Sequence, residues 1–168
     1  MGFVKNIKEK KLVWIALIIL CTVFVFLLIY NKNSYANVYY RTYTKENGWT
    51  KWSKNAEING NKNTISAIEV KMKSNLDGKV VYKSYYNKKW EEKNRTDKQL
   101  SGNKKDEINS IRMKLTGDLN ERYNIKYRIK CTDKEWSAWE DYYGEVFYSE
   151  GTNYDLPIKK VQIKLEEK

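Results

Sequence analysis

One motif occurs three times in the chain, and this internal repetition limits the possible folds more than any other feature. Each copy contains a run of the form aliphatic, any residue, Tyr, base, followed by a tryptophan, a glycine and a closing aliphatic run. The landmark tryptophans are Trp49, Trp90 and Trp136, and the glycines are Gly60, Gly102 and Gly151. We therefore divide the region into repeats at about 38–79, 80–124 and 125–168.

The opening and closing runs of each repeat alternate apolar and polar residues. In the first closing run, Glu69 and Lys71 stand between Ile68, Val70 and Met72. A period of two indicates a strand with one buried face and one solvated face. We expect three or four antiparallel strands in each repeat and almost no helix in this region.

Three such repeats, none of which can bury its apolar face alone, are expected to close about a pseudo-threefold axis. The sequence therefore predicts an all-β domain. A β-prism of three sheets is favoured and a β-trefoil is the alternative, because both place strand pairs and large aromatic rings in a shared core. We assign six aromatic residues to that core, namely Tyr40, Tyr82, Tyr127, Trp49, Trp90 and Trp136.

An uncharged apolar segment, 12–30, precedes the repeats. As a helix it would be roughly 28 Å long, close to the thickness of a bilayer core. The lysines before it predict a cytoplasmic tail over 1–11, a transmembrane helix over 12–30, a linker over 31–37 and an extracellular domain over 38–168. The alternative is a secretory signal that is cleaved near Ala36.

Composition argues against catalysis. The chain has no histidine and two cysteines, which excludes Ser-His-Asp and Cys-His sites, zinc sites that need histidine, and all-cysteine metal sites. Adjacent acids such as Glu91 and Glu92 do not predict the separated carboxylate pair of a glycosidase, and we expect them to be solvated. We therefore expect neither enzymatic activity nor a cofactor or metal.

The chain is basic, with 32 Lys and Arg against 21 Asp and Glu and a formal net charge of +11. A basic exported domain could favour anionic partners such as acidic polysaccharides or lipid headgroups, and export argues against nucleic acid as the ligand. Because the bases are spread over the whole chain and interleaved with acids, we favour solubility as the role of the charge. Arg41, Lys83 and Arg128 recur after the opening tyrosines. They could surround an anionic partner, but we expect them to point into solvent.

The three copies resemble the clostridial hydrophobic repeat, known as the ChW repeat, of exported proteins in Gram-positive bacteria. The copies read YRTYTKENGW, YKSYYNKKW and YRIKCTDKEW, and they close with SAIEVKM, NSIRMKL and KKVQIKL. The resemblance extends over nearly all of residues 38–165. It implies an exported, non-enzymatic module for surface attachment or carbohydrate contact.

Two repeats contain a second tryptophan, Trp52 in the first and Trp139 in the third. On a regular strand, residues three positions apart face opposite sides, so one tryptophan of each pair should point outward. An exposed indole can stack on the apolar face of a sugar ring. The candidate ligand-binding residues are Trp52, Trp139, Tyr43 and Tyr85, for which structural packing is the alternative role.

Together these features predict a membrane-anchored extracellular binding module. Its expected partner is a cell-wall or surface glycan, with a surface protein as the second choice. The alternative is a structural or accessory subunit that positions a membrane or surface protein.

Overall fold

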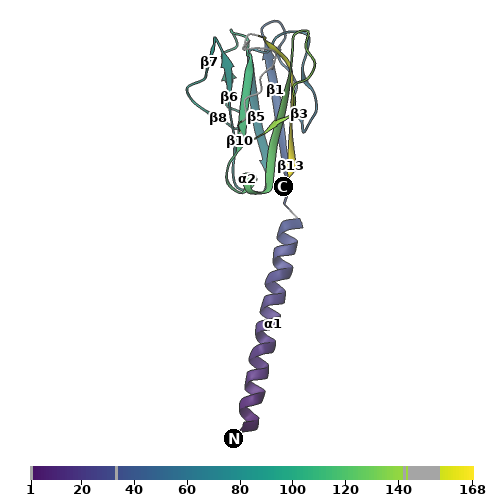
Figure 1. The fold of residues 1–168 in the computed structure, drawn as a ribbon, viewed down its shortest axis with the longest axis vertical. Coiled ribbons are helices and arrows are strands. Elements are labelled where there is room, and N and C mark those ends of the chain that lie inside the picture. The colour runs from purple at the N-terminus through teal and green to yellow at the C-terminus, as the bar shows by residue number, and fades with distance from the viewer. Residues whose placement is uncertain (1, 33, 142, 144–155) are drawn as a thin grey trace. The chain divides into compact units, whose positions relative to one another are not determined.

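The structure, a computed structural model, describes residues 2–32, 34–141, 143 and 156–168. It divides into two compact units, Met1–Tyr35 and Ala36–Lys168. The first unit contains the single helix α1 (Gly2–Lys32), and the second contains all the strands (Figure 1).

The prediction of a transmembrane helix needs correction. Within the described part of the chain, no helix is both long enough and apolar enough to cross a bilayer. The transmembrane helix predicted over 12–30 is therefore wrong for the described residues.

The second unit consists of three antiparallel sheets, each built mainly by one repeat. The first contains β1 (Ala36–Thr44), β2 (Gly48–Trp49), β3 (Ser53–Lys54), β5 (Ala67–Ser74) and β9 (Ser101–Gly102). The second contains β6 (Val80–Tyr86), β7 (Lys89–Trp90), β8 (Arg95–Thr96) and β10 (Ser110–Leu115). The third contains β4 (Asn59–Gly60), β11 (Tyr123–Cys131), β12 (Glu140–Asp141) and β13 (Ile158–Glu167).

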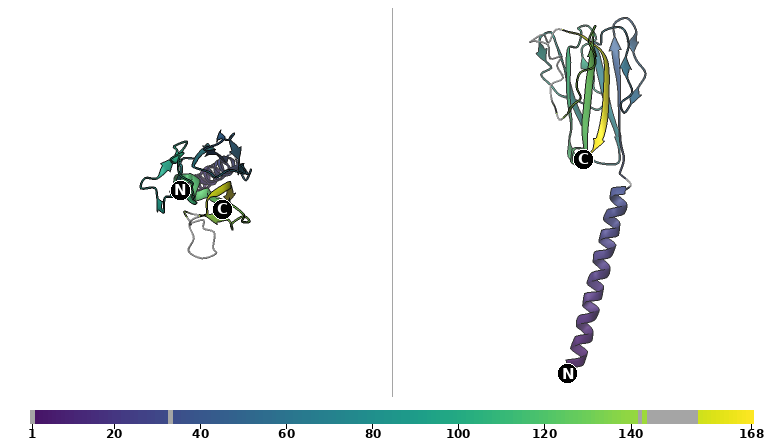
Figure 2. Two further views of the ribbon diagram at one scale, coloured as in Figure 1. Left: turned by 90° about the horizontal axis from the view of Figure 1, so that it is seen from above. Right: turned by 45° about the vertical axis from the view of Figure 1, so that its right-hand side comes forward.

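Each sheet is organised around one long strand pair: β1 with β5, β6 with β10, and β11 with β13. Seen from above, the strands form three groups around a common centre (Figure 2). Burial alternates along β1, where Val38 and Tyr40 are buried while Tyr39 and Arg41 are only partly covered. The apolar faces of all three sheets meet in one core, so the all-β character expected for residues 38–168 is present.

A triangle of hydrogen bonds closes the three repeats on one another. The N–H of Ile65 donates to the carbonyl of Ile158 at 2.8 Å. Ile158 donates in turn to Ile108 at 2.9 Å, and Ile108 donates back to Ile65 at 2.8 Å. All three side chains are buried. Because each residue starts the closing run of a different repeat, this cyclic set marks a pseudo-threefold axis.

A second cyclic set joins each repeat to the closing strand of another. The N–H groups of Ala56, Lys98 and Tyr143 donate to carbonyls on β13, β5 and β10, at 2.6, 2.8 and 2.8 Å. The three donors have nearly the same positive φ, 60°, 60° and 64°. The short strands join the repeats in the same way, since β4 of the first repeat pairs with β13 of the third, and β9 of the second repeat pairs with β5 of the first. Gly60 and Gly102 lie in these short strands, whereas Gly151 lies outside the described residues.

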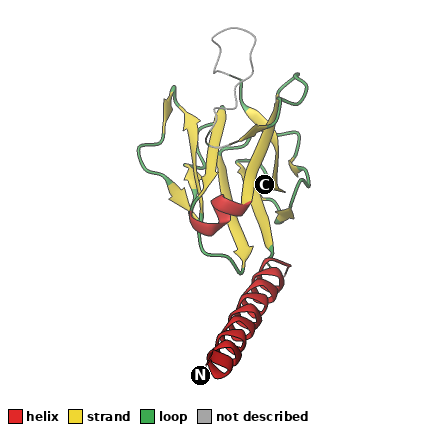
Figure 3. Cartoon of the chain, turned by 60° about the horizontal axis from the view of Figure 1, so that its bottom comes forward, coloured by secondary structure: helices red, strands yellow, loops and turns green. Residues whose placement is uncertain are grey.

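One short helix, α2 (Gly117–Arg122), links β10 to β11 (Figure 3). The sequence predicts a tight turn here, because Thr116, Gly117 and Asp118 are turn-forming residues. The buried side chain of Leu119 packs into the core. This apolar contact stabilises a short helix at a position where the turn-forming residues alone predict a loop.

Candidate functional site

Aromatic rings and cations alternate on the outer face of the first sheet. The guanidinium of Arg41 lies 4.5 Å from the centre of the Trp49 ring and 4.7 Å from that of Trp52. The Nζ atom of Lys71 lies 4.0 Å from the centre of the Trp52 ring. These distances are within the range of cation–π attraction. We call this series of ring, guanidinium, ring and ammonium an outer ladder.

The third sheet carries an equivalent outer ladder. The guanidinium of Arg128 lies 4.9 Å from the Trp136 ring and 4.6 Å from the Trp139 ring. The Nζ atom of Lys164 lies 4.4 Å from the Trp139 ring. Both second tryptophans of the sequence motif therefore occupy the same position in their ladders.

The second sheet completes its ladder with residues from other positions. Its guanidinium belongs to Arg112 of β10, 4.4 Å from the Trp90 ring and 4.6 Å from the ring of Tyr143. The Nζ atom of Lys114 lies 5.0 Å from the Tyr143 ring. Tyr143 belongs to the third repeat, so a neighbouring repeat supplies the second ring that the sequence of the second repeat lacks.

The landmark tryptophans differ in placement from the core role that the sequence predicts. Tyr40, Tyr82 and Tyr127 are buried, whereas Trp49, Trp90 and Trp136 are only partly covered and lie in the outer ladders. In the first repeat β2 ends at Trp49 and β3 begins after Trp52. Because this pair does not lie on one regular strand, both indoles contact the same arginine instead of facing opposite sides.

The candidate tyrosines contact the first ring of a ladder. Tyr43 packs edge-on against Trp49 with ring centres 5.5 Å apart, and Tyr85 packs in the same way against Trp90 at 5.4 Å. Both are partly exposed. The structure thus brings Tyr43 and Trp52 onto one outer face, with Trp49 and Arg41 between them.

The three recurring bases occupy equivalent positions and have different neighbours. Arg41 pairs with Glu69, with 2.7 Å between Nη2 and Oε2. Arg128 donates from Nε to Oε1 of the neutral Gln162 at 2.7 Å.

In the second sheet, Lys83 stands opposite another cation, Arg112. Burial lowers the pKa of Lys83, and the charge of Arg112 lowers this pKa further, against the opposing effect of Glu91. Positive charge at this register position is therefore highest in the second repeat.

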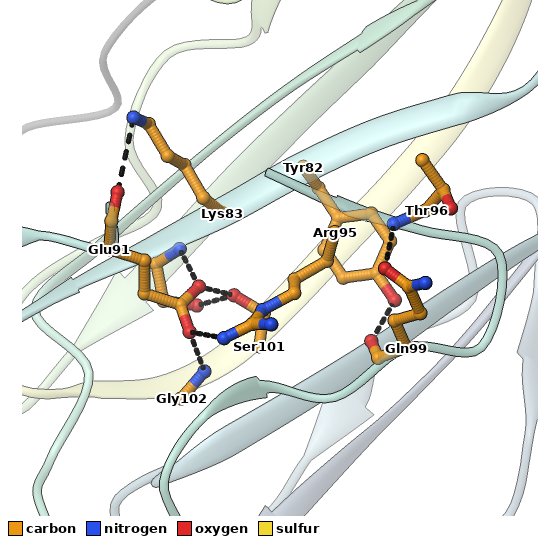
Figure 4. Close-up of polar contacts among 9 residues, drawn as sticks. Tyr82, Lys83, Glu91, Arg95, Thr96, Gln99, Ser101 and Gly102 are labelled. Atoms are coloured by element: carbon orange, nitrogen blue, oxygen red, sulfur yellow. Dashed lines mark hydrogen bonds and ion pairs between the residues drawn. The ribbon is translucent and has the colours of Figure 1, made fainter. Parts of the chain in front are cut away.

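Sequence reasoning missed the role of Glu91, which is buried rather than solvated. One carboxylate oxygen accepts hydrogen bonds from Ser101 Oγ at 2.5 Å and from the Ser84 N–H at 3.1 Å. The other accepts from the Gly102 N–H at 3.1 Å and lies 3.3 Å from Nη2 of Arg95. Figure 4 shows the carboxylate between these groups. These donors stabilise a buried carboxylate that would otherwise be costly.

The first repeat fills the same positions with neutral side chains. Thr42 and Thr50 donate from their hydroxyls to Oδ1 of Asn59 at 2.7 and 2.8 Å, and Asn59 donates from Nδ2 to Ser53 Oγ at 3.0 Å. Strand pairing aligns Ser53 with Arg95, because each stands opposite the core tyrosine of its repeat. Where the first repeat has a neutral network, the second repeat therefore has a buried carboxylate paired with a partly exposed arginine.

A pocket of about 280 Å³ lies beside Trp90. It is lined by Tyr86, Lys89, Trp90, Glu91, Glu92, Lys93 and Arg95. Ser53 comes four residues after Trp49 in the first repeat, whereas Arg95 comes five residues after Trp90 in the second. The pocket therefore lies in a segment that is one residue longer than its counterpart in the first repeat and contains no second tryptophan.

Metal ligands do not gather anywhere in the described part of the chain, where no group of three or more Cys, Asp or Glu residues could hold an ion. Known proteins provide no further guidance. No family model, curated protein or solved structure matches the chain. The resemblance to the ChW repeat therefore stays a prediction.

Proposed function

We propose that the β domain is a non-enzymatic module that recognises carbohydrate at the cell surface through its outer ladders. The observation that supports this proposal is the presence of one ring, guanidinium, ring and ammonium series on each of the three sheets. Sugar-binding sites combine aromatic surface for the apolar face of a pyranose with a few well-placed polar groups for its hydroxyls. Both components are present in every ladder.

The ladders hold their rings in fixed orientations. Trp52 is contacted by Arg41 and Lys71, and Trp139 by Arg128 and Lys164. Side chains that are already ordered lose less conformational entropy when a ligand binds. Preorganised, half-exposed indoles are therefore favourable contacts for a saccharide.

A purely structural role explains the ladders less well. The core is formed by buried side chains of all three sheets, and the ladder tryptophans are not part of it. Exposed cation–π contacts contribute only about 0.5–1 kcal/mol each. In the second sheet, Tyr143 of another repeat supplies the second ring of the ladder. The same series of rings and cations therefore recurs although different residues build it.

A glycan array with the full chain tests the proposal. Trp52→Ala and Trp139→Ala should each lose binding to a glycan that the unaltered protein selects. Ile58→Ala is the matched control, because Ile58 is a large apolar residue with 54% of its surface exposed and no role in a ladder. Equal binding by all these variants would contradict the proposal, as would reproducible co-purification of one surface protein without any glycan binding.

The proposed role requires export, and we adopt cleavage near Ala36 as its route. The compact β domain begins at Ala36, so cleavage before Asn37 would remove one residue from β1 (Ala36–Thr44). Amino-terminal sequencing of protein recovered outside the cell should give a sequence that starts near Asn37. An intact Met1 on the exported protein would contradict this route.

A further inference from the structure

We infer that the second repeat contains a subsite for the anionic group of a saccharide, a carboxylate or a phosphate, in the pocket beside Trp90. This inference rests on the proposed function and adds the class of sugar to it. It also gives the three repeats different roles, since the equivalent positions in the first repeat hold a neutral network.

Charge is the first argument. At equivalent outward positions, the first repeat has the neutral pair of Arg41 with Glu69, and the third has Arg128 with Gln162. In the second repeat, Lys83 and Arg112 stand directly opposite each other. Like charges directly opposite on a sheet are destabilising. Neither residue lines the pocket, but Lys83 donates to the carbonyl of Glu91 at 3.2 Å and Arg112 lies 4.4 Å from the Trp90 ring, and Glu91 and Trp90 do line it. These two cations therefore add positive potential beside the pocket.

Arg95 provides the second argument. Its side chain is 34% exposed and lines the pocket, and its ion pair with Glu91 is long at 3.3 Å. The Nε–H of Arg95 is buried and has no hydrogen-bond partner among the residues that the structure describes. A buried donor without a partner calls for a ligand or water, and guanidinium groups are well suited to carboxylate and phosphate.

The shape of the pocket is the third argument. Its volume of about 280 Å³ is slightly below the roughly 300–1,000 Å³ typical of sites for drug-sized ligands, which favours one sugar ring or its substituent. Trp90 and Tyr86 provide aromatic surface, while Lys89 and Lys93 add cations. The wall also contains two acidic residues, the buried Glu91 and the exposed Glu92, so a substituent with one negative charge fits better than a dense polyanion.

Isothermal titration of the full chain with two matched oligosaccharides tests the inference. One probe is a galacturonate hexamer and the other is its fully methyl-esterified, neutral form. A phosphodiester-linked sugar oligomer distinguishes phosphate from carboxylate as the preferred group. We expect the favoured anionic probe to bind about tenfold more tightly than the neutral hexamer, since charge-assisted hydrogen bonds are the strong ones.

Three variants locate the effect. Lys93→Gln should reduce this preference severalfold, and Lys93→Trp should abolish it, because it removes a cation from the pocket lining and puts a bulky ring in its place. Lys73→Gln is the control for net charge, because Lys73 is an exposed lysine on the first sheet. All three changes concern exposed residues, and the far-ultraviolet circular dichroism of each variant verifies that it folds.

The outcomes separate the two proposals. Equal affinity for charged and neutral hexamers, or an equal loss in Lys73→Gln and Lys93→Gln, would overturn the anionic subsite and leave carbohydrate recognition in place. Absence of binding to every saccharide would contradict the proposed function itself. Inorganic phosphate binding that is lost in Lys93→Trp, together with anion-selective oligosaccharide binding, would support the subsite.

Discussion

The hydroxyl of Tyr82 accepts a hydrogen bond of 3.1 Å from the main-chain N–H of Val70. This contact joins the opening strand of the second repeat to the closing strand of the first. Tyr40 receives an equivalent backbone hydrogen bond from Ile163, and Tyr127 one from Met113. Each core tyrosine therefore fills the centre with its ring and holds a neighbouring sheet with its hydroxyl.

Removing one of these hydroxyls should weaken the domain. Tyr82→Phe keeps the ring but leaves the Val70 N–H and the Gln99 carbonyl, which also contact this hydroxyl, without that partner. An unsatisfied buried polar group costs about 1–3 kcal/mol, so we expect a loss of that size in urea unfolding of the full chain. Tyr39→Phe is the control, because Tyr39 lies on the outer face. An equal effect of both changes would contradict the account.

The same tyrosines predict alkaline sensitivity. Burial raises the pKa of Tyr40 to about 12 and raises the pKa values of Tyr82 and Tyr127 as well. A group with a raised pKa in the folded state stabilises the fold fully below its unfolded pKa, near 10, and this contribution is lost as pH rises further. The free energy of unfolding should therefore fall between about pH 10 and pH 12.

Paired measurements of tyrosinate absorbance and circular dichroism during an alkaline titration check this prediction. Part of the tyrosinate signal should appear together with loss of the β-sheet spectrum. The variant Tyr40→Phe should show a smaller fall in stability over the same pH range. A stability that rises above pH 10 would contradict the burial of these hydroxyls.

Two glycines should differ sharply in their tolerance of a side chain. Gly102 has a φ of +90°, and a Cβ atom there would lie 2.5 Å from the carbonyl oxygen of Ser66 on the neighbouring repeat. Gly48 has a φ of +72°, but no atom lies within 4 Å of its Cβ position. Gly102→Ala should cost about 2–5 kcal/mol through strain and overpacking, and Gly48→Ala about 1 kcal/mol through strain alone.

Thermal or urea unfolding of the two alanine variants measures this difference. Because the contact at Gly102 lies between β9 of the second repeat and β5 of the first, the result reports on how tightly the repeats pack against one another. Equal stability of the two variants would mean that the repeats do not close on one another as described.

The ion pair of Glu91 and Arg95 should show strong coupling. Glu91→Thr leaves Arg95 without its carboxylate and should cost about 2–3 kcal/mol. This cost is lower than for a fully buried pair because the arginine is partly exposed. Arg95→Ser should cost less, because Ser101 and two main-chain N–H groups still satisfy the carboxylate.

The double variant Glu91→Thr/Arg95→Ser recreates the side chains that the first repeat has at Thr50 and Ser53. A double-mutant cycle in urea should give a favourable coupling of at least about 1 kcal/mol between the two original residues. Strict additivity of the two single changes would show that the pair does not act as a unit.

Much of the strand arrangement was predictable because its signal is local. The period-two runs around Tyr40 and Val70 predict long strands with one buried face, and these residues lie on β1 and β5, which pair with each other. Repetition then predicts that three such pairs share one core. The helix α2 could not be predicted from the turn-forming residues near Thr116, because the burial of Leu119 depends on the completed core.

The outer ladders could not be predicted from spacing, since they depend on contacts between strands and between repeats. The sequence places Trp49 and Trp52 on opposite faces only if they lie on one regular strand, which they do not. It gives no sign that Tyr143 would complete the ladder of the second sheet. The burial of Glu91 was hidden for the same reason, because two of its donors, Ser101 and Gly102, lie ten or more residues away.

The most direct test of carbohydrate recognition by the outer ladders is the response of the indole N–H signals in a two-dimensional NMR titration of the full chain with a glycan selected on the array. The account predicts that signals of ladder tryptophans such as Trp52 and Trp139 shift with saturable dependence on glycan concentration, while that of Trp14 on α1 stays in place. Shifts confined to Trp14, or unchanged ladder signals at saturating glycan, would contradict the account.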